Sequence, residues 1–446
     1  MNIAIISLGC PKNQVDADVF CHALLKEGHQ TVADPAEADV ILVNTCAFIE
    51  DAKAEAIENI LMACQYKQQN PDLKVVVTGC LAERYKQQIL QEMPEVDAVV
   101  GIGSNAALPA IVQRVCTAGA GQVESYGPKT DLALGGARII STPQHYAYLK
   151  ISEGCSNGCY YCAIPLIRGR LRSRPLEDCV AEARWLAGEG VRELIVVAQD
   201  PTAYGEDWGE PGSICKLLDA LNEVEGIRWI RVMYAYPERI TDDFIAAMAR
   251  NTKVVPYLDL PIQHCDDAVL KAMNRRGGRA EIESAIARLR AAIPDITLRT
   301  TLIAGFPGET EEQYAELCDF VKTVQFDRLG CFAYSAEENT VAAKMDGQLD
   351  EDTKHRRADH IMELQAEISE ARQQARVGKT LECICDGIDE ESGMYLLRSA
   401  ADCPEIDGNV LVPADAPLTP GGFYKVLITS SDTYDLYGCV EETVEE

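Results

Sequence analysis

Three closely spaced cysteines are the strongest chemical signal in this sequence. The segment EGCSNGCYYC, residues 153–162, holds Cys155, Cys159 and Cys162. Cysteine thiolates hold iron–sulfur clusters, and a closed four-iron site takes four of them. Three ligands would leave one iron open to a substrate or cofactor. No further Cys or His follows within the next dozen residues, so the spacing favours an open cluster, while a zinc site completed by a distant fourth ligand is the alternative.

Three further cysteines are spread over the first eighty residues. Cys10, Cys46 and Cys80 each follow a short β-branched apolar run, and 36 and 34 residues separate them, about one βα unit each. Because successive parallel strands end at the same edge of a sheet, we expect these thiols to be neighbours. Alone they would fit zinc or iron–sulfur, but beside Cys155, Cys159 and Cys162 a second cluster is favoured.

Most of the other cysteines are expected to be ordinary core residues. The chain has eighteen in total, and their spacing does not resemble a secreted disulfide framework. Five of them fall in amphipathic helical patterns, where a free thiol packs as a small hydrophobe: Cys21, Cys64, Cys179, Cys215 and Cys318.

The elements that position Cys10, Cys46 and Cys80 alternate between strand and helix. Strands are predicted at 2–8, 39–45, 74–78 and 96–100, and helices at 15–26, 50–66 and 82–92. This alternation predicts a doubly wound parallel α/β domain over residues 1–120. The Gly-rich, polar stretch 117–143 predicts a linker, which we assign to 121–143.

From residue 144 the alternation restarts on a larger scale. Strands are predicted at 147–152, 193–198, 229–234, 254–260, 297–304 and 328–333, with helices near 176–189, 211–224, 240–250, 279–292 and 311–323. Thr310 and Gln313 form a capping-box pattern before the last helix. Six βα units predict a partial TIM-like (βα)6 barrel over 144–345, with an open doubly wound sheet as the alternative.

The rest of the chain contains two further sequence patterns. Residues 350–377 are highly charged and predict one long helix, within a connecting segment at 346–377. Short alternating runs follow, and they predict a small antiparallel β-barrel of five strands over 378–446.

The segment EGCSNGCYYC resembles the cluster motif of the radical S-adenosylmethionine superfamily. The resemblance implies a 4Fe–4S cluster whose open iron binds S-adenosylmethionine, and it covers residues 146–340. At other predicted strand ends, Gln199 and Asp200 are candidate contacts to that cofactor, as are Gly305 and Glu309 of GFPGE and Arg299 within the strand before it. The competing interpretation is structural: the polar side chains would have hydrogen-bond partners within the protein, and the glycine would serve a turn.

Two further features near these strands have more than one interpretation. His264 also ends a predicted strand, and we expect a buried structural histidine there. Four arginines alternate after the cysteine loop, where an anion-binding site and an ion-paired face are equally compatible with the pattern: Arg168, Arg170, Arg172 and Arg174.

The three N-terminal motifs, SLGCPKNQVDAD, VNTCAF and VTGCLAE, resemble those of the methylthiotransferase family. With a C-terminal module that resembles a TRAM domain, the resemblance covers nearly the whole chain. It implies a second 4Fe–4S cluster on Cys10, Cys46 and Cys80 that carries or activates sulfur, while Cys155, Cys159 and Cys162 hold the radical cluster. The implied reaction places a methylthio group on an unactivated carbon, and no other catalytic residue is assigned.

The substrate is predicted from motifs and from charge. GCPKN, IRGRLRSRP, PEIDG and DTYDLYG resemble the ribosomal-protein branch of the family, the RimO type, which implies an aspartate of ribosomal protein S-twelve as substrate. Residues 376–446 contain four basic and fifteen acidic side chains, a balance that suits a basic protein better than RNA. Methylthiolation of isopentenyladenosine in transfer RNA is the alternative, and a non-catalytic iron–sulfur sensor or sulfur carrier is a third possibility.

Overall composition is consistent with this hypothesis. With a net charge of −29, the chain has no overall excess of basic residues for binding nucleic acid. No apolar run approaches the length of a membrane span, and MNIAIISLGC lacks the pattern of a signal peptide. We therefore expect a cytoplasmic enzyme without a membrane partner, reduced by a protein such as flavodoxin or ferredoxin.

Overall fold

A computed structural model describes residues 1–117, 119 and 121–444. The predicted domain limit at residue 120 and the last two residues of the predicted barrel module lie outside this range. The chain divides into two compact units. The first unit contains Met1–Ser141, Lys150–Arg174 and Ser335–Ala343, and the second contains Thr142–Leu149, Pro175–Tyr334 and Lys344–Glu446.

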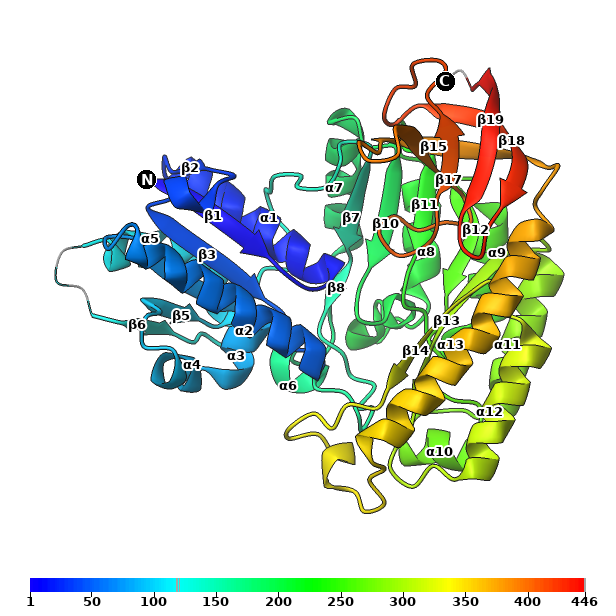
Figure 1. Cartoon of the computed structure of the whole chain (residues 1–446), viewed down its shortest axis with the longest axis horizontal. Helices are drawn as coiled ribbons and strands as arrows, with labels where there is room; N and C mark the ends of the chain where they lie inside the picture. The colour runs from blue at the N-terminus through cyan, green and yellow to red at the C-terminus, as the bar shows by residue number, and fades with distance from the viewer. Residues whose placement is uncertain (118, 120, 445–446) are drawn as a thin grey trace. The chain divides into compact units, whose positions relative to one another are not determined.

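The first unit is built on a six-stranded parallel sheet with strand order β2-β1-β3-β4-β5-β6 (Figure 1). Its strands are β1 (Asn2–Ser7), β2 (Gln30–Thr31), β3 (Val40–Thr45), β4 (Lys74–Gly79), β5 (Ala98–Val100) and β6 (Val123–Ser125). The predicted doubly wound sheet is therefore confirmed. The structure differs at β6, which lies inside the segment predicted to be a linker.

Helices cover both faces of this sheet. They are α1 (Pro11–Lys26), α2 (Glu50–Gln65), α3 (Cys80–Tyr85), α4 (Gln87–Glu92) and α5 (Leu108–Val115). Along β3, Val40 and Leu42 pack with α1 and α5, whereas Ile41 and Val43 pack with α2, α3 and α4, because successive strand side chains point to opposite faces. The single helix predicted over 82–92 is wrong: Lys86 has a φ of 45° and separates α3 from α4.

The second unit contains a parallel sheet in which every strand lies beside its neighbour in sequence. The order is β14-β13-β12-β11-β10-β7, and the pairs from β10 to β14 are parallel. The strands are β7 (Tyr146–Lys150), β10 (Glu193–Val197), β11 (Trp229–Val232), β12 (Val254–Asp259), β13 (Thr297–Ala304) and β14 (Arg328–Ala333). Six strands in this order confirm the predicted partial (βα)6 arrangement.

Helices connect successive strands of this second sheet. They are α7 (Leu176–Gly188), α8 (Ser213–Asn222), α9 (Asp242–Arg250), α10 (Asp267–Ala272), α11 (Arg279–Ala292) and α12 (Glu311–Val324). Five of the six match a helix expected from the sequence, and α10 adds one short turn before α11. Cys179, Cys215 and Cys318 lie within these helices, and Cys21 and Cys64 lie in α1 and α2, as predicted.

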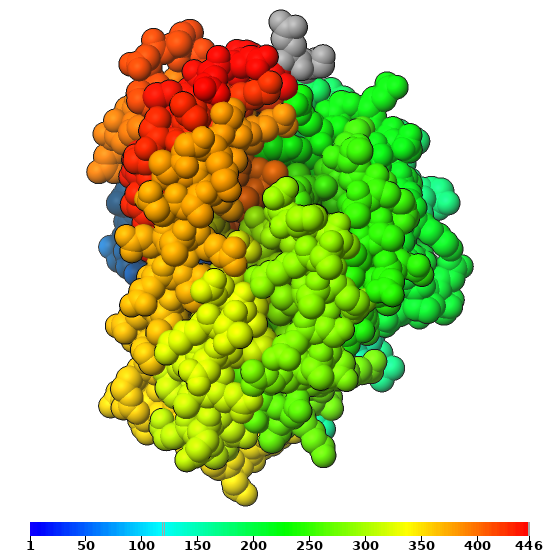
Figure 2. All heavy atoms as spheres, turned by 90° about the vertical axis from the view of Figure 1, so that its right-hand side faces the viewer, coloured from blue at the N-terminus to red at the C-terminus, as the bar shows by residue number. Residues whose placement is uncertain are grey.

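A long helix and a small barrel complete the second unit. Helix α13 spans Glu351–Gln374, and Figure 2 shows its residues along the surface beside those of α12 and reaching the barrel. The barrel is closed, in the order β15-β16-β17-β19-β18. Its strands are β15 (Thr380–Ile388), β16 (Met394–Ser399), β17 (Val410–Pro413), β18 (Phe423–Ser431) and β19 (Leu436–Thr443). One prediction needs correction, because β17 and β19 pair in parallel rather than antiparallel.

Among the described residues, no helix has both the length and the apolar character that crossing a membrane requires.

The N-terminal cap of α12 offers a test of local stability. The Thr310 hydroxyl accepts the Gln313 N–H at 3.3 Å, and the Gln313 side chain accepts the Thr310 N–H at 3.0 Å, which confirms the capping box. We expect Thr310→Ala to destabilise the first turn by about 1 kcal/mol, or about fivefold faster amide exchange there by mass spectrometry. Thr323→Ala, which removes a hydroxyl near the other end of the same helix, is the control. Equal exchange rates in the two variants would contradict the prediction.

Candidate functional site

The three N-terminal cysteines lie at one edge of the first unit's sheet. Strands β1, β3 and β4 are adjacent and parallel, so their carboxyl ends share that edge. Cys10 is the N-cap of α1, Cys46 directly follows β3, and Cys80 follows β4 as the first residue of α3. The structure thus brings together the residues that the sequence predicted to be neighbours. Their role as metal ligands remains a prediction.

The loops that carry these thiols approach one another closely. Gly9 has a φ of 93°, and a Cβ built there would lie 2.7 Å from Cys46 Cβ and 3.0 Å from Cys46 Sγ. Only glycine fits at that position, because any side chain would displace the thiol.

The thiols of Cys10, Cys46 and Cys80, the first thiol set, differ in their electrostatic surroundings. Burial raises the pKa of Cys46, and it raises the pKa of Cys80 to about 12, with the neighbouring thiols adding to both. Burial also acts to raise the pKa of Cys10. The positive charges of Lys12 and Arg168, together with hydrogen bonds from backbone N–H groups, outweigh burial, so the pKa of this thiol is lowered. Cys10 is therefore the thiol of this set that ionises most readily.

Cys155, Cys159 and Cys162, the second thiol set, lie on a loop that two short strands close at its base. Strand β8 (Ser152–Glu153) pairs with β9 (Arg172–Ser173), and the short helix α6 (Ile164–Arg168) follows the cysteines. Gly154 has a φ of 73°, and a Cβ there would lie 2.2 Å from the Arg170 carbonyl oxygen. The second set thus depends on a glycine at its entry.

Within this loop the three thiols are partly exposed and near one another. The Cys155 N–H donates to the Gly169 carbonyl and the Cys162 N–H donates to the Cys159 carbonyl, each at 3.1 Å. Burial raises the pKa of Cys162, and the Cys159 and Cys155 thiols raise it further.

Four buried charges join α1 to both flanks of the cysteine loop. The Arg168 guanidinium contacts Asp16 and Glu153, each at 2.9 Å, and donates to the Asn13 side chain at 3.2 Å. Lys150 pairs with Asp16 and with Glu153, the latter at 3.1 Å. None of the four charged residues is more than 4% exposed. Two cations and two carboxylates therefore compensate one another inside the first unit.

Arg168 also connects this network to the first thiol set. Its pKa is raised well above the ordinary value: burial opposes this, but the negative charges of Cys80, Glu153 and Asp16 outweigh it. A hydrogen bond from Arg168 to Cys80 acts to lower the pKa of that thiol, against the larger effect of burial. The guanidinium thus supplies positive charge where thiolates gather.

The other three arginines of the alternating pattern have different surroundings. Arg172 donates to the carbonyls of Thr130, at 2.7 Å, and of residues in the same turn. Arg174 is buried and donates to the Lys150 carbonyl at 2.8 Å. Only Arg170 has an exposed side chain. The pattern is therefore mainly a structural one, and an anion site built from all four arginines does not form.

Two of the predicted cofactor contacts follow β10 in the second unit. Gln199 is partly buried. Asp200 is 2% exposed, and its carboxylate accepts from Arg239 at 3.0 Å and from the Thr202 hydroxyl. The structure thus gives Asp200 a structural partner, and its contact with a cofactor remains a prediction.

Arg299 lies near the amino end of β13. Its guanidinium pairs with Asp259 at 3.0 Å and lies 3.9 Å from Asp407. Asp407 belongs to the PEIDG segment and also accepts from the Tyr257 hydroxyl at 2.8 Å. These carboxylates hold the guanidinium at the amino end of the strand, whereas the carboxyl ends are where parallel sheets bind ligands. A contact between Arg299 and the cofactor remains a prediction that this placement does not favour.

The segment GFPGE folds back on itself at the carboxyl end of β13. The Gly305 N–H donates to both Glu309 carboxylate oxygens, at 3.0 and 3.1 Å, and Arg357 of α13 contacts the same carboxylate at 2.6 Å. Burial raises the pKa of Glu309, but His264, Gly305 and Arg357 together lower it below its usual range.

His264 is fully buried and acts as a structural residue, as expected. Its Nδ1 accepts the Asp266 N–H at 3.0 Å, so the ring proton is on Nε2, which points to Glu309 at 3.5 Å.

The donor chemistry at both cysteine sets fits an iron–sulfur cluster. Each set offers three thiols, the ligand type that clusters require. Among the described residues, no three Cys, His, Asp or Glu side chains converge on one point as the ligands of a single ion would.

Several residues around the site were not identified from the sequence. They are Asn13, Asp16, Lys150 and Glu153, which surround Arg168. The sequence contained one sign of this network, because Lys150 interrupts the otherwise apolar run AYLKIS. A charge inside a buried strand requires a partner, but the sequence does not say which one.

Comparison with known families matches three parts of the chain. Residues 2–101 match a model described as Uncharacterized protein family UPF0004. Residues 149–321 match the Radical SAM superfamily, and residues 377–440 match a TRAM domain. These matches agree with the three architectural parts that the sequence predicted.

Curated relatives match over almost the whole chain. Ribosomal protein uS12 methylthiotransferase RimO of Acetivibrio thermocellus is 44% identical, with 98% of this chain and 97% of the relative covered. The proteins of the same name from Pelotomaculum thermopropionicum and Bdellovibrio bacteriovorus are each 45% identical, with 98% of this chain and 99% and 96% of those relatives covered.

Among solved structures, the radical S-adenosylmethionine methyltransferase TsrM from Kitasatospora setae has a similar fold. The TM-score is 0.56 at 14% identity, with 74% of this chain and 72% of that chain covered.

Removing the Arg168 charge should destabilise the first unit. Arg168→Met would leave Asp16 and Glu153 buried with Lys150 as the only cation, and breaking such pairs costs about 3–5 kcal/mol. We expect faster amide exchange in α1 and in the cysteine loop of the protein without metal. Arg170→Met removes the same charge from an exposed position and should have no such effect. Equal exchange in the two variants would contradict a stabilising network.

Proposed function

Because this chain belongs to the family of ribosomal protein uS12 methylthiotransferases named RimO, we propose that it adds a methylthio group to the β-carbon of an aspartate of uS12. The proposal is supported by relatives 44–45% identical over nearly the full chain. The structural observation that carries it is the presence of two three-thiol sets in one compact unit. Each set would leave one iron of a four-iron cluster without a protein ligand.

We assign one 4Fe–4S cluster to each thiol set. Cys155, Cys159 and Cys162 would hold the cluster that binds S-adenosylmethionine, and Cys10, Cys46 and Cys80 would hold the cluster that carries sulfur. When bound, these groups supply a reducing electron, a hydrogen-abstracting radical and the methylthio donor. The protein supplies binding, orientation and charge.

The chain's own residues have three tasks around these groups. Gly9 and Gly154 allow the backbone to approach the thiols closely. Arg168 and Lys12 provide positive charge that favours thiolate over thiol at Cys10. The buried network of Arg168 holds the two cysteine-bearing segments in a fixed relation, which a reaction between two separately bound groups requires.

Cofactor contacts are assigned to strand ends of the second unit. Of the five predicted residues, we retain Gln199 and Gly305 as contacts to S-adenosylmethionine, because Gln199 lies two residues after β10 and Gly305 directly follows β13. Asp200, Arg299 and Glu309 would act on the cofactor indirectly, since each side chain already has a charged partner: Arg239, Asp259 and Arg357 respectively.

The charge of the barrel favours a protein substrate over RNA. Of the four basic residues in 376–446, Arg398 is buried against Glu193 and Asp386, and Lys425 pairs with Glu442 at 2.7 Å. Arg376 is also largely buried, within 4.0 Å of Asp402. The described part of the barrel therefore has no cluster of basic side chains for phosphate contacts. Its acidic exterior suits a basic ribosomal protein.

The partners of the reaction follow from this assignment. The substrate would be uS12, free or within the small subunit, and the reductant would be a small electron carrier such as flavodoxin or ferredoxin. Because both are cytoplasmic, we place the enzyme there.

Metal content tests the two-cluster assignment. After anaerobic reconstitution we expect about eight irons per chain, and about four when Cys155, Cys159 and Cys162 are replaced by alanine. The matched control replaces Cys64, Cys116 and Cys215, three cysteines outside both sets, and should retain about eight. A wild-type value near four, or an unchanged value in the first variant, would refute two clusters.

Product analysis tests the substrate. The reduced, reconstituted enzyme with S-adenosylmethionine should release 5′-deoxyadenosine and add one methylthio group to purified uS12, detected by mass spectrometry. Prenylated transfer RNA is offered in parallel. Modification of the RNA alone would replace the proposal by the transfer-RNA reaction, and absence of 5′-deoxyadenosine would favour the non-catalytic sensor.

A further inference from the structure

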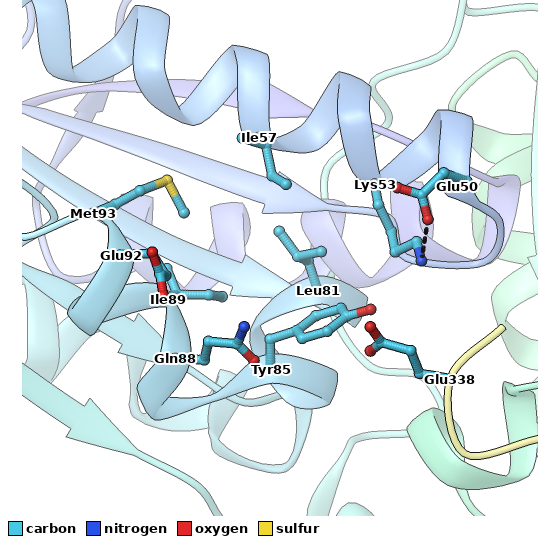
Figure 3. Close-up of a pocket in the computed structure, with 10 residues that line it drawn as sticks. All are labelled: Glu50, Lys53, Ile57, Leu81, Tyr85, Gln88, Ile89, Glu92, Met93 and Glu338. Atoms are coloured by element: carbon cyan, nitrogen blue, oxygen red, sulfur yellow. Dashed lines mark ion pairs between the residues drawn. The ribbon is translucent and has the colours of Figure 1, made fainter.

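A cavity of about 210 Å³ opens on the first unit beside the elements that carry Cys46 and Cys80. Helices α2, α3 and α4 line it together with Glu338 from the segment 335–343 (Figure 3). Its volume is below the roughly 300–1,000 Å³ of pockets for cofactors and drug-sized ligands. Its size suits one long side chain better than a whole small molecule.

The cavity combines an apolar floor with an acidic rim. Ile57, Leu81 and Met93 provide apolar surface, as Figure 3 shows. Glu92 and Glu338 are exposed carboxylates at its rim, and neither has an ion pair among the described residues. This combination fits a group with an aliphatic stem and a positive end.

The cation already present in the cavity does not neutralise the rim. Lys53 is 6% exposed and pairs with Glu50 at 2.6 Å and with the buried Glu337 at 3.3 Å. Figure 3 shows the Lys53–Glu50 pair at one end, away from Glu92. Glu338 lies at the same end as this pair, so Glu92 is the rim carboxylate that is away from the existing cation and available to an incoming positive charge.

The rim is held in place by its own contacts. Arg84 pairs with Glu337 at 2.5 Å and donates to the carbonyls of Ala47 and Glu338, each at 3.0 Å. These bonds fasten the segment 335–343 to α3. The pKa of Tyr85 is raised by burial and by a hydrogen bond to the Glu338 carboxylate, which together outweigh the nearby Arg84 charge. The Tyr85 hydroxyl thus orients Glu338 at the mouth of the cavity.

An exposed apolar strip continues from the cavity along α2. Ile57, Leu61 and Met62 are 41%, 46% and 51% exposed. Contiguous apolar surface with a polar rim marks sites of protein contact. Phe48, 44% exposed, lies two residues after Cys46. The strip and the cavity therefore lie on the elements that carry the first thiol set.

We propose that this cavity receives a lysine or arginine side chain of the protein substrate. The proposal rests on the proposed function and adds a docking point to it. The aliphatic stem packs on Ile57, Leu81 and Met93, and the charged end contacts Glu92, which Figure 3 shows at the opposite end of the cavity from Glu338. Since ribosomal proteins are basic, such side chains are abundant on the substrate. The docked segment lies beside the elements that present Cys46 and Cys80.

Binding of purified uS12 to the full-length, reconstituted protein tests the proposal. The double variant Glu92→Gln and Glu338→Gln keeps the shape of the rim and removes two charges. We expect its Kd for uS12 to rise about tenfold at low salt, with the difference shrinking at high salt. The matched control is Glu55→Gln with Glu58→Gln, which removes the same charge from exposed positions of α2 outside the cavity. Its Kd should change less than about twofold.

A second variant tests the apolar half of the cavity. Ile57→Ser shortens an exposed side chain and should raise the Kd about threefold, with iron content unchanged. The docking proposal is overturned if the variant Glu92→Gln with Glu338→Gln binds uS12 as tightly as its control, or if it gains affinity only for transfer RNA. The proposed function would stand in either case. A wild-type protein that neither binds nor modifies uS12 overturns both.

Discussion

The buried charge network of Asp16, Lys150, Glu153 and Arg168 is the constraint on which the site depends. Removing four charges from water costs several kcal/mol per ion, and only complete mutual pairing offsets that cost. Here every member contacts two partners of opposite charge. Because the network links α1 to both flanks of the cysteine loop and Arg168 reaches Cys80, the two thiol sets belong to one cooperative unit.

The second unit uses the same principle to hold its barrel. Glu193 of β10 pairs with Arg231 of the sheet at 2.8 Å and with Arg398 of the barrel at 2.7 Å, and Arg398 also pairs with Asp386 at 2.6 Å. The motif PEIDG has a related role, since Glu405 accepts from the Tyr146 hydroxyl at 2.9 Å and Asp407 accepts from Tyr257. A motif that resembles one branch of the family thus performs a structural task. Because Arg398 is buried in these contacts, the exterior of the barrel is left acidic.

Most of the fold could be predicted from hydrophobic periodicity, and the failures have local causes. Strands β13 and β14 begin and end where the apolar runs predict. The helix predicted over 82–92 keeps its apolar pattern on both sides of Lys86, whose positive φ no periodicity reveals. The three-residue strand β6 carries too few residues for an alternating pattern and forms only because β5 offers an edge. The parallel β17–β19 pair likewise depends on barrel closure rather than on either strand's sequence.

At the site, the sequence by itself determined which cysteines lie together, because spacing and position after apolar runs place thiols at one sheet edge and on one loop. It could not distinguish the roles of the alternating arginines. Only the tertiary structure decided that Arg168 is a buried partner of Asp16, 152 residues away along the chain, and that Arg170 is exposed. The physical reason is that an ion pair depends on which charges packing buries together. Periodicity reports burial of a face, but it carries no information on the partner that a buried charge requires.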